Sequence, residues 1–185
     1  MNNIIFLLEE SSMKNTLQHI LPKVLPPDIN IVLIPHEGKR HLQKSIPIKL
    51  RGWRDQNTSF VILQDQDNSD CVKLKCELVE LAENSRQKNI LIRIVCRELE
   101  SWFIGDFDAI EQAYGVDISK IKNRARYRNP DNLADAKGEL KKIINYQPFT
   151  GSDRIARYMK IDGNHSHSFN VFIDGVRKLA QHMSC

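Results

Sequence analysis

The chain has 185 residues, of which 41% are hydrophobic and 27% are charged, and its formal net charge is +4. This length suits one domain, or one domain with a small appendage, and the apolar content is sufficient for a buried core. The first ten residues have no basic start and too short an apolar run for a signal peptide or a membrane span. We therefore expect a cytoplasmic protein that makes no contact with a membrane.

The charge is distributed unevenly along the chain. Residues 1–114 contain 14 Lys/Arg and 16 Asp/Glu, whereas residues 115–185 contain 13 Lys/Arg and 7 Asp/Glu. An acidic front half joined to a basic back half is the composition expected of a metal site beside a surface that binds a polyanion. Chance differences in composition can produce the same asymmetry.

Short apolar runs alternate with helical patterns over the first hundred residues. The runs predict strands at residues 3–8, 29–34, 60–63 and 90–95. Between them, the spacing of apolar residues predicts helices over 11–24, 42–50 and 74–82, and Pro47 is expected to kink or split the second of these. This alternation predicts an α/β fold with a small, parallel, four-stranded sheet. The nearly continuous apolar strands predict helices on both of its faces.

Beyond residue 114 the chain changes in character. We predict an α/β domain over 1–114 and a basic, mostly helical extension over 115–185 that packs on it. Pro130-Asp131 resembles a helix start, and residues 151–153 and 164–168 resemble loops, each able to open another helix. A last helix is expected to present an apolar face from Phe169 to Leu179.

Acidic residues follow three of the four predicted strands. They are Glu9, Glu10, Asp65, Asp67, Asp70, Glu98 and Glu100. The carboxyl ends of parallel strands lie along one edge of a sheet, where ligands bind in open α/β folds. Several carboxylates in one cleft repel each other unless a cation neutralises them, and Mg²⁺ or Mn²⁺ prefers oxygen ligands. The pattern therefore predicts a metal site, although Asp, Asn and Ser also favour turns and helix caps.

These features resemble the Toprim fold of topoisomerases, bacterial primases and overcoming-lysogenization-defect nucleases. A glutamate follows the first strand and Asp65-Gln66-Asp67 follows the third. With the segments at 7–11, 36–39 and 96–102, the chain looks most like small stand-alone Toprim-like proteins found beside ABC-type ATPases in prokaryotic defence loci. The resemblance to the Toprim fold itself covers residues 1–105. It implies a Mg²⁺-dependent nuclease that acts on DNA or RNA, with an ATPase as protein partner. An oligomer is compatible with the sequence.

The resemblance also implies roles for individual residues. Glu9, Asp65 and Asp67 would hold one or two metal ions, and Lys39 or Arg97 would stabilise charge in the transition state. The candidates for a second metal are Glu10, Asp70, Glu98 and Glu100.

The residue after the first glutamate departs from the family pattern. A glycine usually stands there, and Glu10 stands there in this chain. The pair Glu37-Gly38 has that glycine, but it lies only 28 positions before Asp65, which leaves one helix–strand unit too few. Glu9 is therefore the better match.

Other patterns are less specific. Lys120, Lys122, Arg124, Arg126 and Arg128 occupy every second position. On an extended segment they would form a track for phosphates, and on a helix they would be spread around its surface. Among the histidines, His36 and His41 could lie near the metal edge, and the region of His165 and His167 suits a loop.

Two other functions fit parts of the sequence. A non-catalytic subunit that binds an ATPase would use the acids as caps and surface ion pairs. A phosphate-transferring enzyme of the haloacid-dehalogenase kind also uses Asp-x-Asp after a strand, but it places the pair after the first strand rather than the third.

Overall fold

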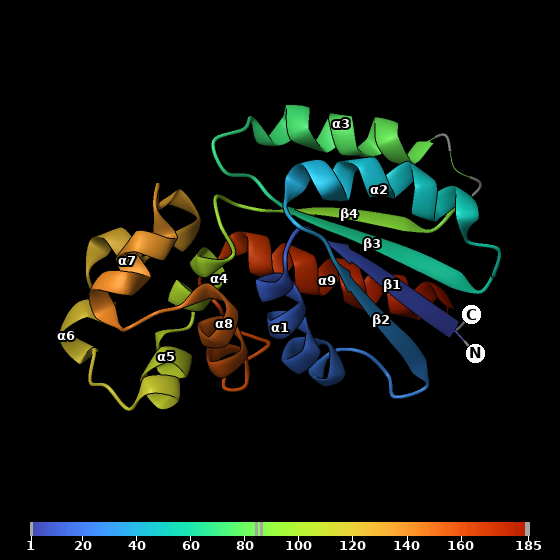
Figure 1. Cartoon of the computed structure of the whole chain (residues 1–185). Helices are drawn as coiled ribbons and strands as arrows, with labels where there is room; N and C mark the ends of the chain where they lie inside the picture. The colour runs from blue at the N-terminus through green and yellow to red at the C-terminus, as the bar shows by residue number, and fades with distance from the viewer. Residues whose placement is uncertain (1, 84, 86, 184–185) are drawn as a thin grey trace.

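The computed structural model describes residues 2–83, 85 and 87–183 of the chain. At its centre is one sheet of four parallel strands, in the spatial order β2-β1-β3-β4 (Figure 1). The strands are β1 (Asn2–Leu8), β2 (Ile29–Pro35), β3 (Thr58–Asp65) and β4 (Ile90–Val95). The predicted α/β class and the four-stranded parallel sheet are confirmed.

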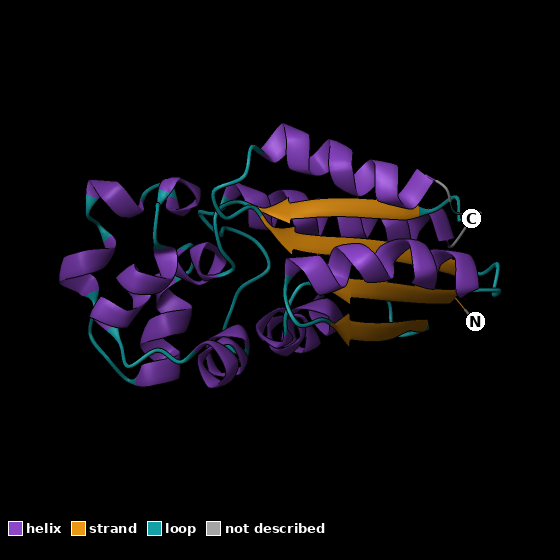
Figure 2. Cartoon of the chain, turned by 45° about the horizontal axis from the view of Figure 1, so that its top comes forward, coloured by secondary structure: helices purple, strands orange, loops and turns teal. Residues whose placement is uncertain are grey.

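Helices cover both faces of this sheet (Figures 1 and 2), as the continuous apolar strands predicted. On one face, α2 (Lys39–Gly52) and α3 (Cys71–Glu83) enclose a core that includes Ile5 and Ile62. On the other face, α1 (Ser11–Ile20) and α9 (His167–Met183) pack over the intervening residues of the same strands, such as Phe6. Successive residues of each central strand thus enter two separate cores.

A group of short helices lies beyond the carboxyl ends of the strands (Figure 1), and we call α4 to α8 with the turns between them the helical lobe. Its elements are α4 (Glu100–Ile104), α5 (Phe107–Tyr114), α6 (Ser119–Lys122), η2 (Ala125–Tyr127), η3 (Pro130–Asn132), α7 (Ala136–Ile143) and α8 (Pro148–Ala156). One further 3₁₀ turn, η1 (Leu21–Lys23), extends α1.

The lobe and the sheet share one hydrophobic core. The cluster on the α1 side runs from Phe6 in β1 to Leu140 in α7 and Phe172 in α9. In addition, α8 contacts α1, and α9 contacts β4. The helical carboxyl-terminal segment therefore packs on the sheet; the boundary that we predicted after Tyr114 stays a prediction.

Three local predictions need correction. Residues 151–153, which we predicted as a loop able to open a helix, lie inside α8, which begins three residues earlier at Pro148. A Cβ on Gly151 would lie 2.5 Å from a ring carbon of Tyr146, so this glycine permits close packing and does not form a turn. The segment at Pro130 forms only a 3₁₀ turn, and α7 begins six residues later, where Asp135 caps the Gly138 N–H. Finally, Pro47 does not split α2, which is one helix whose buried face includes Leu42, Ile46 and Leu50; a kink at Pro47 stays a prediction.

The predicted last helix is confirmed as α9, whose buried face includes Phe169, Phe172 and Val176. Within the described part of the chain, no helix is both long and apolar enough to cross a membrane.

Candidate active site

Glu9 and Asp65 meet where β1 and β3 end. These two strands are neighbours, with Leu8 opposite Leu63. The Glu9 N–H continues the pairing by donating to the Leu63 carbonyl at 3.2 Å. The Glu9 carboxylate then accepts a hydrogen bond from the Asp65 N–H, with 3.1 Å between Asp65 N and Glu9 Oε2. The two acids therefore lie on the same edge of the sheet, as the parallel order required.

Burial makes both carboxyl groups hard to ionise. Burial, together with the charges of Asp67 and Glu10, raises the pKa of Glu9 to about 7. The hydrogen bond from the Asp65 N–H opposes this shift but is outweighed. Asp65 is only 8% exposed, and burial followed by the charges of Glu9, Glu10 and Glu100 raises its pKa well above the usual range. Its Oδ1 atom is buried and has no hydrogen-bond partner among the described residues.

Asp67 and Lys39 form the outer side of the same edge. Asp67 has a left-handed backbone with φ of 51°, and its N–H donates to the carbonyl of Arg97, whose φ is 61°. A positive φ in non-glycine residues is uncommon and recurs at functional sites. The Lys39 ammonium lies 3.1 Å from Asp67 Oδ2. The Gly38 N–H donates to the Glu9 carbonyl, which places the start of α2 beside the first acid.

Glu100 reaches the edge from the first turn of α4 and is 1% exposed. Its Oε1 atom accepts a hydrogen bond from the Tyr146 hydroxyl at 3.0 Å and lies 3.8 Å from the Lys137 ammonium. Its Oε2 atom is buried without a partner among the described residues. Burial raises the pKa of Glu100 above its ordinary value despite the nearby ammonium.

Lys137 links the helical lobe to these acids. Its backbone N–H, at the start of α7, donates to Glu98 Oε2 at 2.9 Å. Burial disfavours the charge on its ammonium, but neighbouring carboxylates outweigh that effect and raise its pKa. These carboxylates are Glu100, Glu10, Glu98 and Asp65. Lys137 is thus the cation that balances the innermost acids of the edge.

A family model described as a domain of unknown function (DUF4276) matches residues 8–177. The chain belongs to the DUF4276 family. The match begins at the last residue of β1 and ends within α9, so it includes every residue of the sheet edge described above. Neither a curated protein nor a solved structure matches the chain.

Other predicted site residues of this DUF4276 protein have local structural partners. The Asp70 carboxylate accepts the Lys73 N–H at 2.9 Å and so caps α3. Ser12 donates to Glu10 Oε1. His36 is buried, with Nδ1 2.8 Å from the Leu8 carbonyl and Nε2 2.5 Å from Ser45 Oγ, and burial lowers its pKa. These contacts place His36 beneath the edge as a support for β1 and α2.

The other histidines considered for the metal edge or for a metal site lie at the surface. His41 is exposed and accepts the Glu37 N–H at Nδ1. His165 and His167 are also exposed. His165 lies in the segment before α9, where its N–H donates to the Gly105 carbonyl, and His167 is the first residue of α9.

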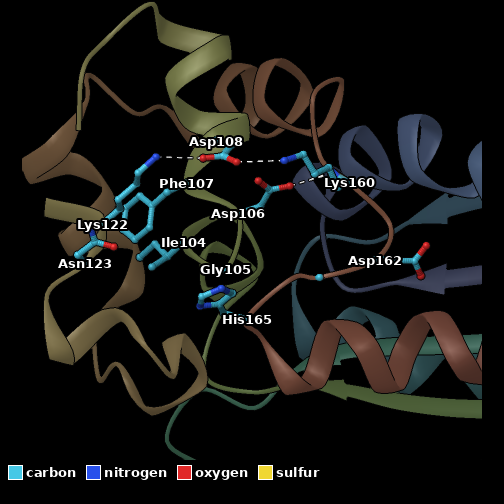
Figure 3. A pocket seen from close by; sticks show the side chains of 11 residues that line it. Ile104, Gly105, Asp106, Phe107, Asp108, Lys122, Asn123, Lys160, Asp162 and His165 are labelled. Carbon is cyan, nitrogen blue, oxygen red and sulfur yellow. Dashed lines mark hydrogen bonds and ion pairs between the residues drawn. The ribbon is translucent and has the colours of Figure 1, made fainter. Parts of the chain in front are cut away.

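The five alternating basic residues do not lie on one extended segment. Lys120 and Lys122 belong to α6, and Arg126 belongs to η2. Lys122 pairs with Asp108 at 3.2 Å (Figure 3), and Arg126 pairs with Glu139. Lys120, Arg124 and Arg128 are exposed. A continuous phosphate track is therefore absent from this segment, and a role in nucleic-acid binding stays a prediction for the individual residues.

Lys137 and Tyr146 are the residues that sequence reasoning missed. Neither stands in a recognisable motif, and both lie more than 35 positions after Glu100 in the chain. The only available signal was indirect: a group of buried acids needs a cation or hydrogen-bond donors from elsewhere in the fold.

The chemistry of the edge suits a hard cation. Two buried carboxylate oxygens, one on Asp65 and one on Glu100, lack partners within the described part of the chain, and oxygen atoms are the ligands that Mg²⁺ and Mn²⁺ prefer. The described residues contain no group of three His, Cys, Asp or Glu side chains already arranged around one point. A bound metal would therefore require side chains such as Asp67, now paired with Lys39, to reorient.

Proposed function

We propose that this DUF4276 protein is a metal-dependent nuclease that hydrolyses phosphodiester bonds in DNA or RNA. One observation supports this most directly: the Asp65 Oδ1 and Glu100 Oε2 atoms are buried at the sheet edge and have no partner among the described residues. Each unsatisfied buried polar atom costs stability, and such atoms concentrate where function requires them. A structural role for these acids would favour paired oxygens.

Each group at the edge has a proposed role. Glu9, Asp65 and Asp67 would hold the first cation, and Glu100 with Glu10 or Glu98 the second. Bound there, Mg²⁺ would polarise a phosphate oxygen and lower the pKa of a water molecule. The ammonium groups of Lys39 and Lys137 lie against the same acids and would contact the negatively charged phosphate.

We also propose three narrower assignments, which rest on the resemblance to Toprim-like proteins. They are a Toprim-type active site, an ABC-type ATPase as partner and a role in anti-phage defence in the cytoplasm. Co-expression of the two proteins from one locus, followed by purification on a tag carried by the ATPase, would test the partnership. Recovery of the ATPase alone would contradict it.

The nuclease activity is tested by incubating the purified chain with supercoiled plasmid, single-stranded DNA and RNA in Mg²⁺, in Mn²⁺ and in EDTA. We expect cleavage only with a metal ion, and at least a 100-fold loss in Asp65→Asn. Asp108→Asn is the matched control, because it removes one acid outside the edge. Calorimetric titration with Mn²⁺ adds a readout that does not depend on the substrate. If wild-type protein neither binds Mn²⁺ nor cleaves any substrate, alone or with the ATPase, the interaction-subunit hypothesis replaces this one.

A further inference from the structure

A second feature of the helical lobe is an open hollow between the end of α5 and α8, with a volume of about 640 Å³. Two arginines and two tyrosines contribute to its lining: Tyr114, Arg154, Arg157 and Tyr158. None of these residues belongs to the acidic edge or to the alternating basic segment. Asp153 adds one carboxylate to the lining. The hollow thus presents mainly cationic and aromatic groups that the proposed active site does not use.

Arg154 is available to a ligand. Its guanidinium carbon lies 4.5 Å from the centre of the Tyr114 ring, its side chain is exposed, and it forms no ion pair with the described residues. Arg157 differs, because it is paired with Asp153, which also contacts His19. A guanidinium stacked on an aromatic ring keeps its in-plane N–H donors free, and their spacing matches two oxygens of a phosphate.

Tyr158 supplies a flat surface to the same hollow. It follows Arg154 by four positions, just beyond the end of α8, and it is 44% exposed. Exposed aromatic rings next to arginines are the usual means of holding unpaired bases, because every base has a face that can stack. An acidic protein segment would use Arg154 as well, but it would gain little from the ring of Tyr158.

Contacts through α8 connect the hollow with the acidic edge. At Gly151 an added Cβ would lie 2.5 Å from the Tyr146 ring and 3.1 Å from the Tyr114 hydroxyl, so the two tyrosines approach each other there. Tyr146 then donates to Glu100 at the edge, while Tyr114 carries the stacked Arg154. The side chains of Tyr114 and Tyr146 therefore connect the hollow to the proposed active site.

We propose that this hollow binds single-stranded nucleic acid, with a backbone phosphate on Arg154 and a base stacked on Tyr158. This inference rests on the proposed nuclease function and specifies where a single strand is held beside the acidic edge. Recognition of this kind tolerates any sequence, because it uses a phosphate and a ring face and no base-edge hydrogen bonds.

The test is fluorescence anisotropy with labelled 12-nucleotide single-stranded DNA and RNA, measured in EDTA at several salt concentrations so that no cleavage occurs. For Arg154→Gln we expect about fivefold weaker binding and a salt slope that is smaller by about 0.7, the value of one single-strand phosphate contact. Arg154→Lys should retain the slope and lose part of the affinity. Tyr158→Leu should bind about tenfold more weakly with an unchanged slope. Arg51→Gln, an exposed arginine on α2, is the control for net charge.

The outcomes separate this inference from the nuclease proposal. Weaker binding in Arg154→Gln and Tyr158→Leu, with normal binding in the Arg51→Gln control, supports the hollow even if no cleavage is ever detected. Wild-type affinity and salt slope in Arg154→Gln would overturn it, even for an active nuclease, and so would a wild-type protein that binds neither oligonucleotide. Loss of binding to a labelled poly-glutamate peptide in Arg154→Gln, with oligonucleotide affinity unchanged, would also overturn it and assign the hollow to an acidic protein. The melting temperature of each variant is measured to check that it is folded.

Discussion

Two groups of acids in this chain have pKa values displaced in opposite directions. At the sheet edge, burial raises the pKa values of Glu9, Asp65 and Glu100. In the first turn of α5, Asp108 lies between two ammonium groups, 3.2 Å from Lys122 and 3.0 Å from Lys160 (Figure 3). Hydrogen bonds from those lysines, that of Lys160 first, lower the pKa of Asp108.

Burial and a lack of partners, rather than the number of acids, distinguish the candidate active site from a structural cluster of charges. Every contact around Asp108 satisfies a charge at the surface, where ion pairs contribute little. At the edge, two carboxylate oxygens have no partner among the described residues, and the Lys137 ammonium lies 3.8 Å from Glu100. Such a group lowers the stability of the metal-free protein, and perturbed carboxylates of this kind are typical of functional sites.

The largest effect is expected from Asp65→Asn. It removes a buried charge and preserves the shape of the side chain, so at pH 8 the metal-free protein should become more stable, because burial raises the pKa of Asp65 and makes its ionised form costly. Metal-dependent cleavage should be lost. Chemical denaturation in EDTA measures the first effect. A clear loss of stability would instead show that Asp65 serves the fold.

Lys137→Met removes a positive charge from the edge, whereas Asp65→Asn removes a negative one. The variant keeps most of the aliphatic stem and removes the ammonium that faces Glu100, so we expect a loss of about 1–3 kcal/mol in the free energy of unfolding at pH 8. Lys142→Met is the matched control, since Lys142 is 69% exposed and pairs with Glu139 at the surface. Equal melting temperatures for the two variants would contradict the role of Lys137.

Glu9 should make the stability of the metal-free protein depend on pH. Its pKa is raised from 4.5 to about 7 on folding, so the folded state holds the proton more tightly than the unfolded state. Its contribution to stability is therefore fully present below about pH 4.5 and is lost as the pH rises toward and through 7. Stability in EDTA should decline across this window, and Glu9→Gln should flatten the profile there. An identical profile in the variant would refute the assignment.

The smallest effect is expected from Asp108→Asn. Because its pKa is lowered on folding, the ionised side chain contributes stability above its usual value of 3.8, and this contribution is lost as the pH falls through the lower folded value. At neutral pH the melting temperature should change by at most about 4 °C, and high salt should reduce the difference. A larger change in melting temperature that persists in high salt would show that the ion pairs of Asp108 contribute more than surface pairs do.

The sequence was informative where a residue's role follows from its neighbours in the chain. The apolar runs predicted all four strands, and the parallel order then required Glu9 and Asp65 to share an edge. Lys137 and Tyr146 could not be predicted in this way, because only tertiary packing of the lobe brings them to Glu100. Gly151 was misread for the same reason: its lack of a side chain serves contact with Tyr146, and a turn has the same sequence signature.

The separation of Glu9 and Lys137 by 128 positions has a consequence for synthesis of the protein. At about 5–20 residues per second, a ribosome adds Lys137 roughly 6–26 s after Glu9. During that interval the emerging chain holds the acids of the first strands without the ammonium that balances them, and without the tyrosine that contacts Glu100. The acidic edge is therefore complete only after the lobe has been translated and has docked, and a chain that terminates early displays carboxylates without a finished site.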